Sequence, residues 1–358
     1  MTSLYYHLHG GAAIKTSTDG DMLDFSVNIS PLFPPIGSLS LDVFSLHRYP
    51  SLDGLGIKEF YRVKFGISRS QVLSLNGAIE GIYLLPRALR LRRIAVLSPS
   101  FYEYERAGKI AEAEIIYIHL EAENCFQLPK IEVLANALAG ADAFFAANPN
   151  NPTGTDVPPE IIMALASRFP DKWFIIDEAF IQFTPDFPVN SLMSKVTALK
   201  NIIVLHSLTK FYALPGLRLG AVIAHQDVIK ELINYKEPWT VNAVAESVAV
   251  RLLECGDYDN SLRTMILSES ARIRASLSTI DGIILAGSAA NFFLAQWQSG
   301  SSLDGLLAYL ANCRIHVRDC RNFSGLEINY FRFAVRTPEE NTILLDAIKT
   351  APGSPQKS

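Results

Sequence analysis

The sequence has 358 residues, of which 49% are hydrophobic and 19% are charged, and its formal net charge is −4. This balance is typical of a globular protein with a sizeable core, and the length suits one large and one smaller domain. A slightly acidic chain without a basic block argues against a surface for nucleic acid or membrane, so neither partner is expected. No apolar run approaches the length of a membrane span, and no signal sequence is recognised; we expect a cytoplasmic protein.

The first 50 residues are rich in turn-forming residues and have little helical periodicity. Such a segment is either disordered or lies against the body of the protein. Its apolar residues favour the second alternative: Leu23, Phe25, Val27 and Ile29. We therefore predict that residues 1–50 form an arm that packs on the functional site.

From residue 76 onward, segments with the character of strands and helices alternate. We predict helices at 76–91, 104–111 and 159–168, and strands at 93–97, 114–119, 143–147, 173–177 and 202–205. This alternation indicates an α/β fold with a mostly parallel sheet that is covered by helices on both faces. We place a large domain at 51–240.

The remainder of the chain, 241–358, has a different pattern and is predicted to form a smaller α+β domain. We expect helices at 240–253 and 260–279 and strands at 291–295 and 330–335. Residues 351–358 are predicted to be a frayed tail. The chain has four cysteines, Cys125, Cys255, Cys313 and Cys320. Their spacing indicates neither a disulfide framework nor a metal site, so we expect reduced core thiols and no bound metal.

Lys210 is the most informative residue, because it follows the buried strand at 202–205. An amine at the end of such a strand loses solvation, which lowers its pKa and frees its lone pair to attack a carbonyl group. Ser207 and Arg218 flank it and can donate hydrogen bonds to a phosphate. The alternative is a helix-capping Ser/Thr pair beside a solvated lysine.

Other polar residues also follow predicted strands. The loop from Asn148 to Asn151 follows the strand at 143–147, and Asp177 ends the strand at 173–177. Ligands of open α/β sheets bind at the carboxyl ends of the strands. We therefore expect these residues and Lys210 to share one site.

The segment Ser207-x-x-Lys210 followed by Gly216-Leu217-Arg218-Leu219-Gly220 resembles the lysine segment of fold-type I aminotransferases, which use pyridoxal phosphate (PLP). It is most similar to the histidinol-phosphate aminotransferase branch. The resemblance extends from His9 to about Thr350, and it implies a fold-type I architecture with PLP as the cofactor.

The resemblance implies a role for each residue that contacts the cofactor ring. Lys210 would bind PLP, Asp177 would keep the ring nitrogen protonated, and Asn151 would donate to the phenolic oxygen. Phe101 would stack on the ring. Each residue also has a simpler interpretation: a capping or ion-paired aspartate, an ordinary loop amide, and a phenylalanine of the core.

A second group of residues would bind the cofactor phosphate. Free N–H groups of Gly77, Ala78 and Ile79 at a helix start would form the cradle, together with Ser207, Arg218 and, less directly, Thr209. The resemblance also implies that Tyr49 reaches the phosphate of a neighbouring subunit. It therefore predicts a homodimer with shared active sites.

Three arginines are candidates for the anionic groups of a substrate. Arg332 and Arg336 flank an apolar strand, where an arginine is costly unless it is paired, which favours an anionic ligand. The resemblance assigns Arg332 to the α-carboxylate, and Arg318 and Arg336 to further anionic groups, with the division between them open. It adds a terminal-phosphate pocket from the arm, made of His9 with the amides of Gly10 and Gly11, and it counts Asn28 among the substrate-binding residues. The alternative for His9 is a mobile arm residue.

Three features favour decarboxylation over transamination. The opening His9-Gly10-Gly11 and the segment at 24–32, Asp-Phe-Ser-Val-Asn-Ile-Ser-Pro-Leu, resemble the threonine-phosphate decarboxylases of cobalamin biosynthesis. The segment at 237–242 and Phe180 do so too, whereas aminotransferases usually have tyrosine at the position of Phe180.

We therefore expect a PLP-dependent carboxy-lyase that acts on O-phospho-L-threonine. Because one methyl group in a pocket is worth only about 1–3 kcal/mol, O-phospho-L-serine stays open as a substrate. The alternatives are a histidinol-phosphate aminotransferase and a non-catalytic binding protein that retains the fold.

Overall fold

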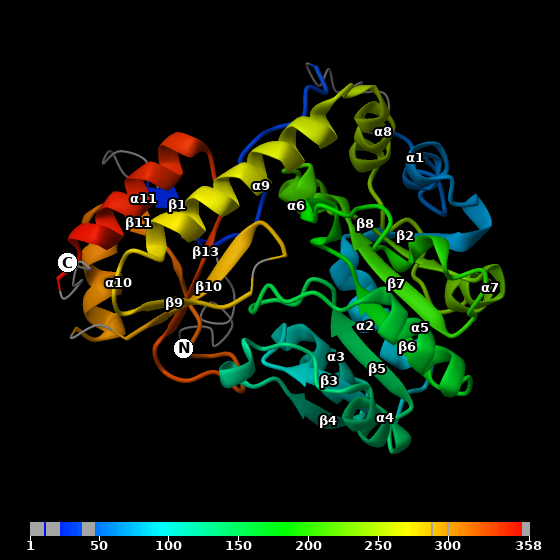
Figure 1. The fold of residues 1–358 in the computed structure, drawn as a ribbon. Helices are drawn as coiled ribbons and strands as arrows, with labels where there is room; N and C mark the ends of the chain where they lie inside the picture. Colours follow the sequence, from blue (N-terminus) through cyan, green and yellow to red (C-terminus); the bar gives the residue numbers. More distant parts are fainter. Residues whose placement is uncertain (1–10, 12–21, 38–46, 288, 299–300, 353–358) are drawn as a thin grey trace, which may run out of the picture.

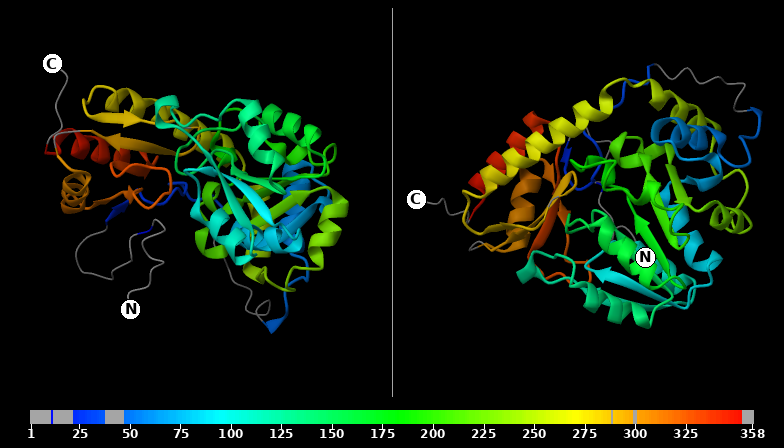
Figure 2. Two further views of the ribbon diagram at one scale, coloured as in Figure 1. Left: turned by 90° about the horizontal axis from the view of Figure 1, so that it is seen from below. Right: turned by 45° about the vertical axis from the view of Figure 1, so that its right-hand side comes forward.

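The computed structural model describes residues 11, 22–37, 47–287, 289–298 and 301–352. A large domain is built on a seven-stranded sheet, and a small domain on a four-stranded sheet. In Figure 1 the small domain lies on the left, and the long helix α9 (Tyr258–Leu277) connects it to the large domain on the right. Figure 2 shows the same two-part arrangement from two further sides. The predicted boundaries at 50 and 240 stay predictions.

The large sheet has the order β2-β8-β7-β6-β5-β3-β4. Its strands are β2 (Val72–Asn76), β3 (Arg93–Ser98), β4 (Glu114–His119), β5 (Ala143–Ala147), β6 (Trp173–Asp177), β7 (Ile202–Ser207) and β8 (Leu219–Ala224). The expectation of a mostly parallel sheet is confirmed, with β8 antiparallel to both of its neighbours. The link from β7 to β8 is too short for the crossover that a parallel pair requires.

Helices cover both faces of this sheet. Those of the large domain are α1 (Leu55–Phe65), α2 (Ala78–Ala88), α3 (Tyr102–Ile110), α4 (Ile131–Ala139), α5 (Pro159–Arg168), α6 (Leu208–Phe211), α7 (Gln226–Ile233) and α8 (Ala243–Arg251). Along β7, Val204 packs into one core cluster and Leu205 into the other, so both faces of the strand are buried. Double burial explains why these strands are continuous apolar runs.

The small sheet is antiparallel, with the order β12-β13-β10-β9. Its strands are β9 (Ile283–Leu285), β10 (Phe292–Trp297), β12 (Arg318–Asp319) and β13 (Tyr330–Ala334), and its helices are α9, α10 (Leu303–Asn312) and α11 (Pro338–Thr350). The strands expected at 291–295 and 330–335 are therefore confirmed to within two residues at each end. The helix expected at 240–253 begins later, at Ala243, because the side chain of Asn242 accepts the Ala245 N–H and caps it.

Short 3-10 turns complete the chain: η2 (Arg69–Gln71), η3 (Ala122–Asn124), η4 (Ile181–Phe183), η5 (Leu192–Ser194), η6 (Pro215–Leu217) and η7 (Leu252–Glu254). The helices expected at 76–91 and 104–111 are observed as α2 and α3. Helix α2 begins two residues later and ends three residues earlier than expected, and α3 begins two residues earlier and ends one residue earlier. The glycine at position 77 has φ +76° and ψ +155°, which delays the start of α2 to Ala78.

The described part of the arm packs onto the small domain. Strand β1 (Leu23–Asp24) pairs in parallel with β11 (Ile315–His316), and Phe25 is fully buried. The carbonyl of Phe25 accepts a hydrogen bond from the Ala334 N–H at 2.8 Å, and the N–H of Ser30 donates to the carbonyl of Lys210 at 2.9 Å. Residues 22–36 therefore lie against the body of the protein, and the arm reaches the main chain of Lys210, while the extent of the arm to residue 50 stays a prediction.

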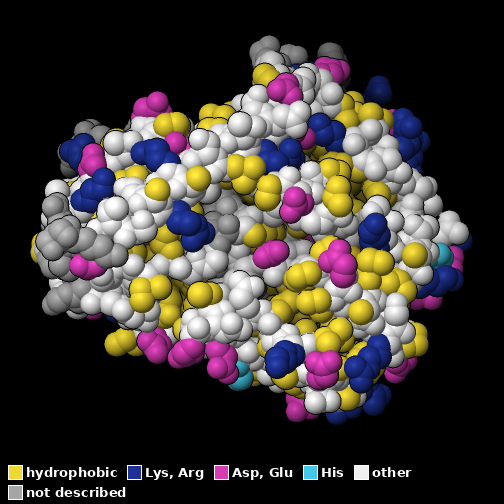
Figure 3. All heavy atoms as spheres, in the orientation of Figure 1, with side chains coloured by type: hydrophobic (Ala, Val, Ile, Leu, Met, Phe, Trp, Pro, Cys, Tyr) yellow, Lys and Arg dark blue, Asp and Glu magenta, His cyan; other side chains and the backbone are white. Residues whose placement is uncertain are grey.

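The four cysteines differ in how far they are buried. Cys255 and Cys320 are buried as expected, but Cys125 and Cys313 are exposed, so the expectation of four core thiols is wrong for these two. On the face seen in Figure 3, acidic and basic side chains are interspersed with hydrophobic ones. Within the described ranges, no helix is long and apolar enough to cross a membrane.

Candidate active site

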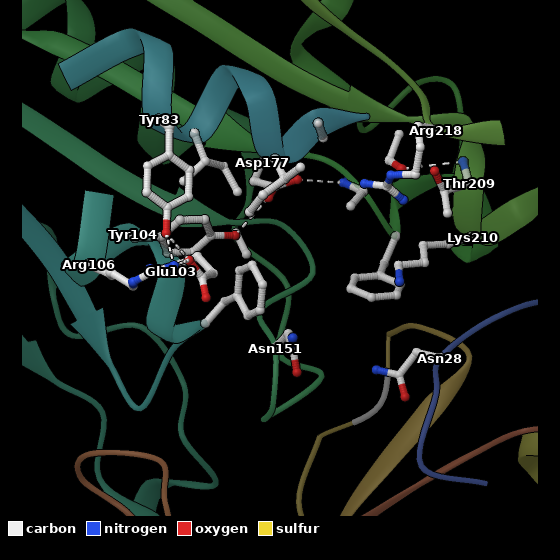
Figure 4. A pocket seen from close by; sticks show the side chains of 18 residues that line it. Asn28, Tyr83, Glu103, Tyr104, Arg106, Asn151, Asp177, Thr209, Lys210 and Arg218 are labelled. Atoms are coloured by element: carbon white, nitrogen blue, oxygen red, sulfur yellow. Dashed lines mark hydrogen bonds and ion pairs between the residues drawn. The ribbon is translucent and has the colours of Figure 1, made fainter. Parts of the chain in front are cut away.

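A cavity of about 440 Å³ opens at the carboxyl ends of β5, β6 and β7. It brings together most of the site residues that the sequence predicts: Asn28, Ala78, Ile79, Phe101, Asn151, Asp177, Phe180, Ser207, Thr209, Lys210 and Arg218. Figure 4 shows Lys210, Thr209 and Arg218 on one side of the cavity, Asp177 in the middle and Asn151 and Asn28 below. These residues come from separate segments of the chain, so the cavity is a product of the fold.

Lys210 lies in the short helix α6, one turn beyond the end of β7. Its surroundings lower the pKa of the amine to about 8, mainly through burial and then through the positive charges of Arg332 and Arg218. Ser207 caps this helix by accepting the Thr209 N–H at 3.3 Å. The capping interpretation is therefore correct for Ser207, whereas the amine of Lys210 lies in the cavity rather than in bulk water.

Asp177 is the last residue of β6, and only 6% of its surface is exposed. Its carboxylate accepts hydrogen bonds from the hydroxyl of Tyr104 at 2.8 Å and from the Ala179 N–H at 3.0 Å. Burial raises the pKa of Asp177 to about 6, although both hydrogen bonds and the charge of Lys210 act in the opposite direction. The carboxyl group therefore titrates close to neutrality.

The N-terminus of α2 and the guanidinium of Arg218 form one wall of the cavity. A Cβ built on Gly77 would lie 2.4 Å from the guanidinium, so only glycine permits this approach. Arg218 itself has φ +59°, a conformation that is uncommon for arginine. The first N–H groups of a helix have no partner within the helix, and together with Arg218 they make this wall attractive to an anion.

Asn151 and Arg332 are brought together from distant parts of the chain. The guanidinium of Arg332 donates to the side-chain oxygen of Asn151 and, at 2.9 Å, to the carbonyl of Ser26. It also lies over the ring of Phe292. Arg332 is buried, and its Nε has no hydrogen-bond partner among the described residues. Burial lowers the pKa of Arg332 to about 10.

Phe101 and Phe180 supply the aromatic surface of the cavity. Phe101 precedes α3 and makes an edge-to-face contact with Tyr104, with the ring centroids 5.6 Å apart. Phe180 is almost completely buried and contacts Phe292 edge-to-face at 5.1 Å. Because position 180 carries no hydroxyl, this part of the cavity wall is apolar.

None of the three arginines predicted to bind the substrate lines the cavity; Arg332 is linked to it through Asn151. Arg318 is buried; it donates to the side-chain oxygen of Asn322 at 2.7 Å and lies over the ring of Phe323. Arg336 lies just beyond β13, where it forms an ion pair with Glu340 at 2.8 Å. The argument that an arginine here implies an anionic ligand therefore fails for Arg336, because this chain already supplies the anion.

The arm contributes one described residue to the cavity. Asn28 is 3% exposed, and its side-chain oxygen has no hydrogen-bond partner among the described residues. Gly11 donates its N–H to the hydroxyl of Ser26 at 2.7 Å and does not line the cavity. The predicted contributions of His9 and Gly10 lie outside the described residues.

Tyr49 lies on the surface, with 81% of its area exposed, and its ring packs against that of Trp239 at a centroid distance of 4.9 Å. It does not line the cavity of this chain. Trp239 belongs to the segment at 237–242 whose resemblance to the decarboxylases was noted above.

Sequence reasoning missed the four cavity-lining residues with polar or ionisable side chains on the wall opposite Lys210, namely Tyr83, Glu103, Tyr104 and Arg106. Glu103 and Arg106 bond to the hydroxyl of Tyr83, the arginine at 2.6 Å, and Figure 4 shows the three opposite Lys210. Burial and Glu103 raise the pKa of Tyr83 to about 12. Tyr104 was assigned only to a helix. Its position in the first turn of α3, which directly follows the predicted ring-stacking residue Phe101, was the available signal.

The family model for aminotransferases of class I and II matches residues 45–348. A putative threonine-phosphate decarboxylase of Caldanaerobacter subterraneus subsp. tengcongensis is 36% identical, and the match covers 90% of this chain and 88% of the relative. The threonine-phosphate decarboxylase of Salmonella typhimurium is 31% identical, with 97% of each chain covered. Among solved structures, histidinol-phosphate aminotransferase from Clostridium acetobutylicum has a TM-score of 0.84 at 28% identity, covering 92% of this chain and 98% of that chain.

Proposed function

The chain belongs to the aminotransferase class I and II family, and from this membership we propose that it is a PLP-dependent decarboxylase of O-phospho-L-threonine. The product would be (R)-1-amino-2-propanol O-2-phosphate, which is used in cobalamin biosynthesis. The two threonine-phosphate decarboxylases at 36% and 31% identity support this choice. The structural observation that carries it is the single cavity that joins Lys210, Asp177 and Phe180.

The cavity residues fit PLP. The wall formed by α2 and Arg218 suits the cofactor phosphate, and the buried carboxylate of Asp177 suits a protonated pyridine nitrogen. Lys210 would bind the aldehyde carbon, since its lowered pKa leaves part of the amine neutral near pH 8. When bound, PLP supplies an electron sink for the bond that breaks at the α-carbon.

The substrate carboxylate is assigned to Arg332. A buried guanidinium with an unpaired Nε carries an energetic penalty that an anion would relieve. Arg318 lies directly opposite Arg332 on the neighbouring strand β12. The second anionic group, the substrate phosphate, is therefore assigned to Arg318, although it does not line the cavity, together with Asn28, which does. Arg336 is the weaker candidate because Glu340 already neutralises it.

Arg332 would also select the bond that breaks. By holding the α-carboxylate of the substrate in a fixed orientation, Arg332 would decide that the bond from the α-carbon to the carboxylate breaks rather than the bond to hydrogen. Carbon dioxide then leaves, the electron pair of the broken bond stays with the substrate, and the α-carbon takes up a proton. Lys210 is the proposed proton donor, since its amine faces the cavity and has a pKa of about 8.

A second candidate function is transamination of histidinol phosphate. It is favoured by the similarity to the aminotransferase from Clostridium acetobutylicum. The apolar wall at Phe180 favours the decarboxylase, because aminotransferases of this branch usually have a tyrosine there. The two reactions use the same cofactor and lysine, so only the products separate them.

The test is to supply PLP-loaded protein with O-phospho-L-threonine, O-phospho-L-serine and histidinol phosphate in separate assays. Carbon dioxide and the amine product are measured, and keto product is measured with 2-oxoglutarate present. Carbon dioxide from a phospho-amino acid without keto product supports the decarboxylase, and the relative rates rank threonine against serine. Keto product from histidinol phosphate, with no carbon dioxide, would replace this proposal by the aminotransferase.

A homodimer with shared active sites is also proposed. Tyr49 and Trp239 form an exposed aromatic pair, and Leu52, three residues after Tyr49 in the sequence, is 63% exposed. A second subunit would cover such a surface. In this arrangement Tyr49 would reach the cofactor phosphate of the partner. The expected cytoplasmic location stays a prediction.

Replacing Tyr104 with phenylalanine tests whether the hydroxyl of Tyr104 lowers the pKa of Asp177. The hydroxyl lowers the pKa of Asp177 against the effect of burial. Its loss should therefore raise that pKa above about 6, so that more of the carboxyl is protonated at neutral pH. We expect the acid limb of the pH–rate profile to move to higher pH and kcat at pH 7 to fall by about 3- to 10-fold. An unshifted acid limb would contradict this coupling.

A further inference from the structure

The small domain contacts the large domain directly beside the aromatic wall of the cavity. Ser98, the last residue of β3, is 2% exposed, and its hydroxyl donates a hydrogen bond to the carbonyl of Ser324 at 2.9 Å. We call the contact of Ser98 with Ser324 and Gly325 the clasp. It joins residues 226 positions apart in the sequence.

Gly325 allows the close approach in two ways. Its φ is +87°, a conformation that residues with a side chain rarely adopt. A Cβ at this position would also lie 2.6 Å from the hydroxyl oxygen of Ser98 and 3.3 Å from the backbone nitrogen of Pro99. Any larger residue would therefore push the two loops apart.

On the side of the small domain, the clasp ends the loop that holds Arg318. This loop runs from Asp319 to Gly325 and begins where β12 ends. The guanidinium of Arg318 donates to the side chain of Asn322 at 2.7 Å and lies 5.4 Å from the ring centre of Phe323. Both partners precede the clasp by only one to three residues, so a displacement of the clasp would displace the groups that orient Arg318.

On the side of the large domain, the clasp adjoins the loop that carries Phe101. The carbonyl of Pro99, next to Ser98, accepts a hydrogen bond from the side chain of Asn150 at 3.0 Å. The following residue, Asn151, is the one that accepts a hydrogen bond from Arg332. A second cavity of about 200 Å³ lies between the two loops, lined by Ser100 and Phe101 on one side and Asn322 and Phe323 on the other.

The clasp therefore links three elements of the site: the stacking wall, the asparagine loop and the strand of Arg318. We propose that Ser98 and Gly325 are positioning residues that act through Arg318, and that they set the affinity for the phosphate of the substrate. This inference rests on the proposed function, because it assigns that phosphate to Arg318. Neither residue lines the cavity that contains Lys210, so the clasp is expected to control KM rather than kcat.

The test compares Ser98→Ala and Gly325→Ala with two matched controls in the PLP-loaded protein. Ser324→Ala retains the backbone carbonyl that accepts the hydrogen bond, so it keeps the clasp. Gly140→Ala adds a methyl group at a glycine whose nearest neighbour would be 3.8 Å away, the side chain of Arg93. We expect KM for O-phospho-L-threonine to rise about 3- to 10-fold in Ser98→Ala and by about 10-fold or more in Gly325→Ala. Neither control should change KM by more than about twofold.

Two further readouts separate positioning from a general loss of structure. Hydrogen exchange of the amides at 319–326 should become faster in the clasp variants, while PLP absorbance and kcat stay near the wild-type values. Binding of inorganic phosphate, measured by calorimetry, should weaken by a factor similar to the rise in KM. If Gly325→Ala does not fold, Ser98→Ala decides the question with the same readouts.

The inference is overturned if Ser98→Ala leaves KM, phosphate binding and loop exchange unchanged in an active enzyme. It is also overturned if kcat and PLP absorbance fall together with affinity, since that pattern indicates damage to the cofactor site. Failure of the proposed function has a different signature, namely no carbon dioxide from any phospho-amino acid with the wild-type protein. In that event, phosphate binding and loop exchange still decide whether the clasp positions Arg318.

Discussion

Replacing Lys210 with alanine is expected to lower the rate of carbon dioxide release by about 1,000-fold or more, because the change removes both the attachment point of PLP and the proposed proton donor. The variant should bind PLP without the absorbance change that covalent attachment to the lysine produces. The rate is measured under saturating substrate, so that weaker binding does not enter the comparison.

The matched control is Lys58→Ala. Lys58 is also a mostly buried lysine, 7% exposed, but it is bonded to Asp53 at 2.8 Å and does not line the cavity. We expect Lys58→Ala to retain activity within about threefold, even if its melting temperature falls. Comparable losses in the two variants would mean that buried lysines matter here for folding, and the proposed role of Lys210 would be wrong.

The pKa of Lys210 gives this prediction a pH dependence. The amine must be neutral to attack the aldehyde of PLP, and its pKa lies near 8 rather than near the ordinary lysine value of 10.5. The rate at which cofactor-free protein takes up PLP should therefore rise with pH through about 8 and level off above it. Because the charge of Arg332 helps to lower this pKa, Arg332→Gln should move the midpoint to higher pH. A midpoint above pH 10 in the wild-type protein would contradict the assigned environment.

Replacing Asp177 with asparagine should have the second-largest effect, a fall in kcat of about 100- to 1,000-fold. Asparagine is nearly isosteric, but its single side-chain oxygen can keep only one of the two hydrogen bonds that Asp177 accepts at separate oxygens, from the hydroxyl of Tyr104 and from the Ala179 N–H. The main loss is the negative charge that would keep the ring nitrogen protonated. We therefore expect the variant to fold and to bind PLP, but to stabilise the departing electron pair poorly.

The control is Asp142→Asn, since Asp142 lies at the amino-terminal end of β5, whereas Asp177 lies at the carboxyl end of β6. The carboxylate of Asp142 accepts the N–H groups of Arg92 and Arg93 at 2.8 and 2.9 Å, just before β5. Its loss of charge should leave kcat unchanged within about twofold. If Asp177→Asn retained more than about a tenth of wild-type kcat, its carboxylate could not be the principal partner of the ring nitrogen.

Local sequence patterns were sufficient for several strands of the large sheet, namely β5 and β6 in its interior and β4 at its edge. The runs at 114–119, 143–147 and 173–177 were placed at the observed bounds of β4, β5 and β6. A strand buried on both faces is a short apolar run between turn residues, and this signal needs no knowledge of distant residues. The rule that ligands bind at carboxyl ends then correctly grouped Asn151, Asp177 and Lys210 in one cavity.

Pairings between distant residues could not be predicted in the same way. Arg336 was expected to bind an anionic ligand, but it forms an ion pair with Glu340, which lies four residues later in α11. Tyr104 has the appearance of a core aromatic, and only the packing of α3 against the sheet brings its hydroxyl to Asp177. The approach of Gly325 to Ser98 depends on how the two domains meet.

The sequence by itself determined the α/β class, the central strands and the chemical identities at their carboxyl ends, because periodicity and strand ends are local properties of the chain. Only the tertiary structure decided which charges are already neutralised, where the arm lies and which side chains set the pKa of Asp177 and Lys210. Those outcomes depend on distances and burial, and both are set by contacts between residues that are far apart in the sequence.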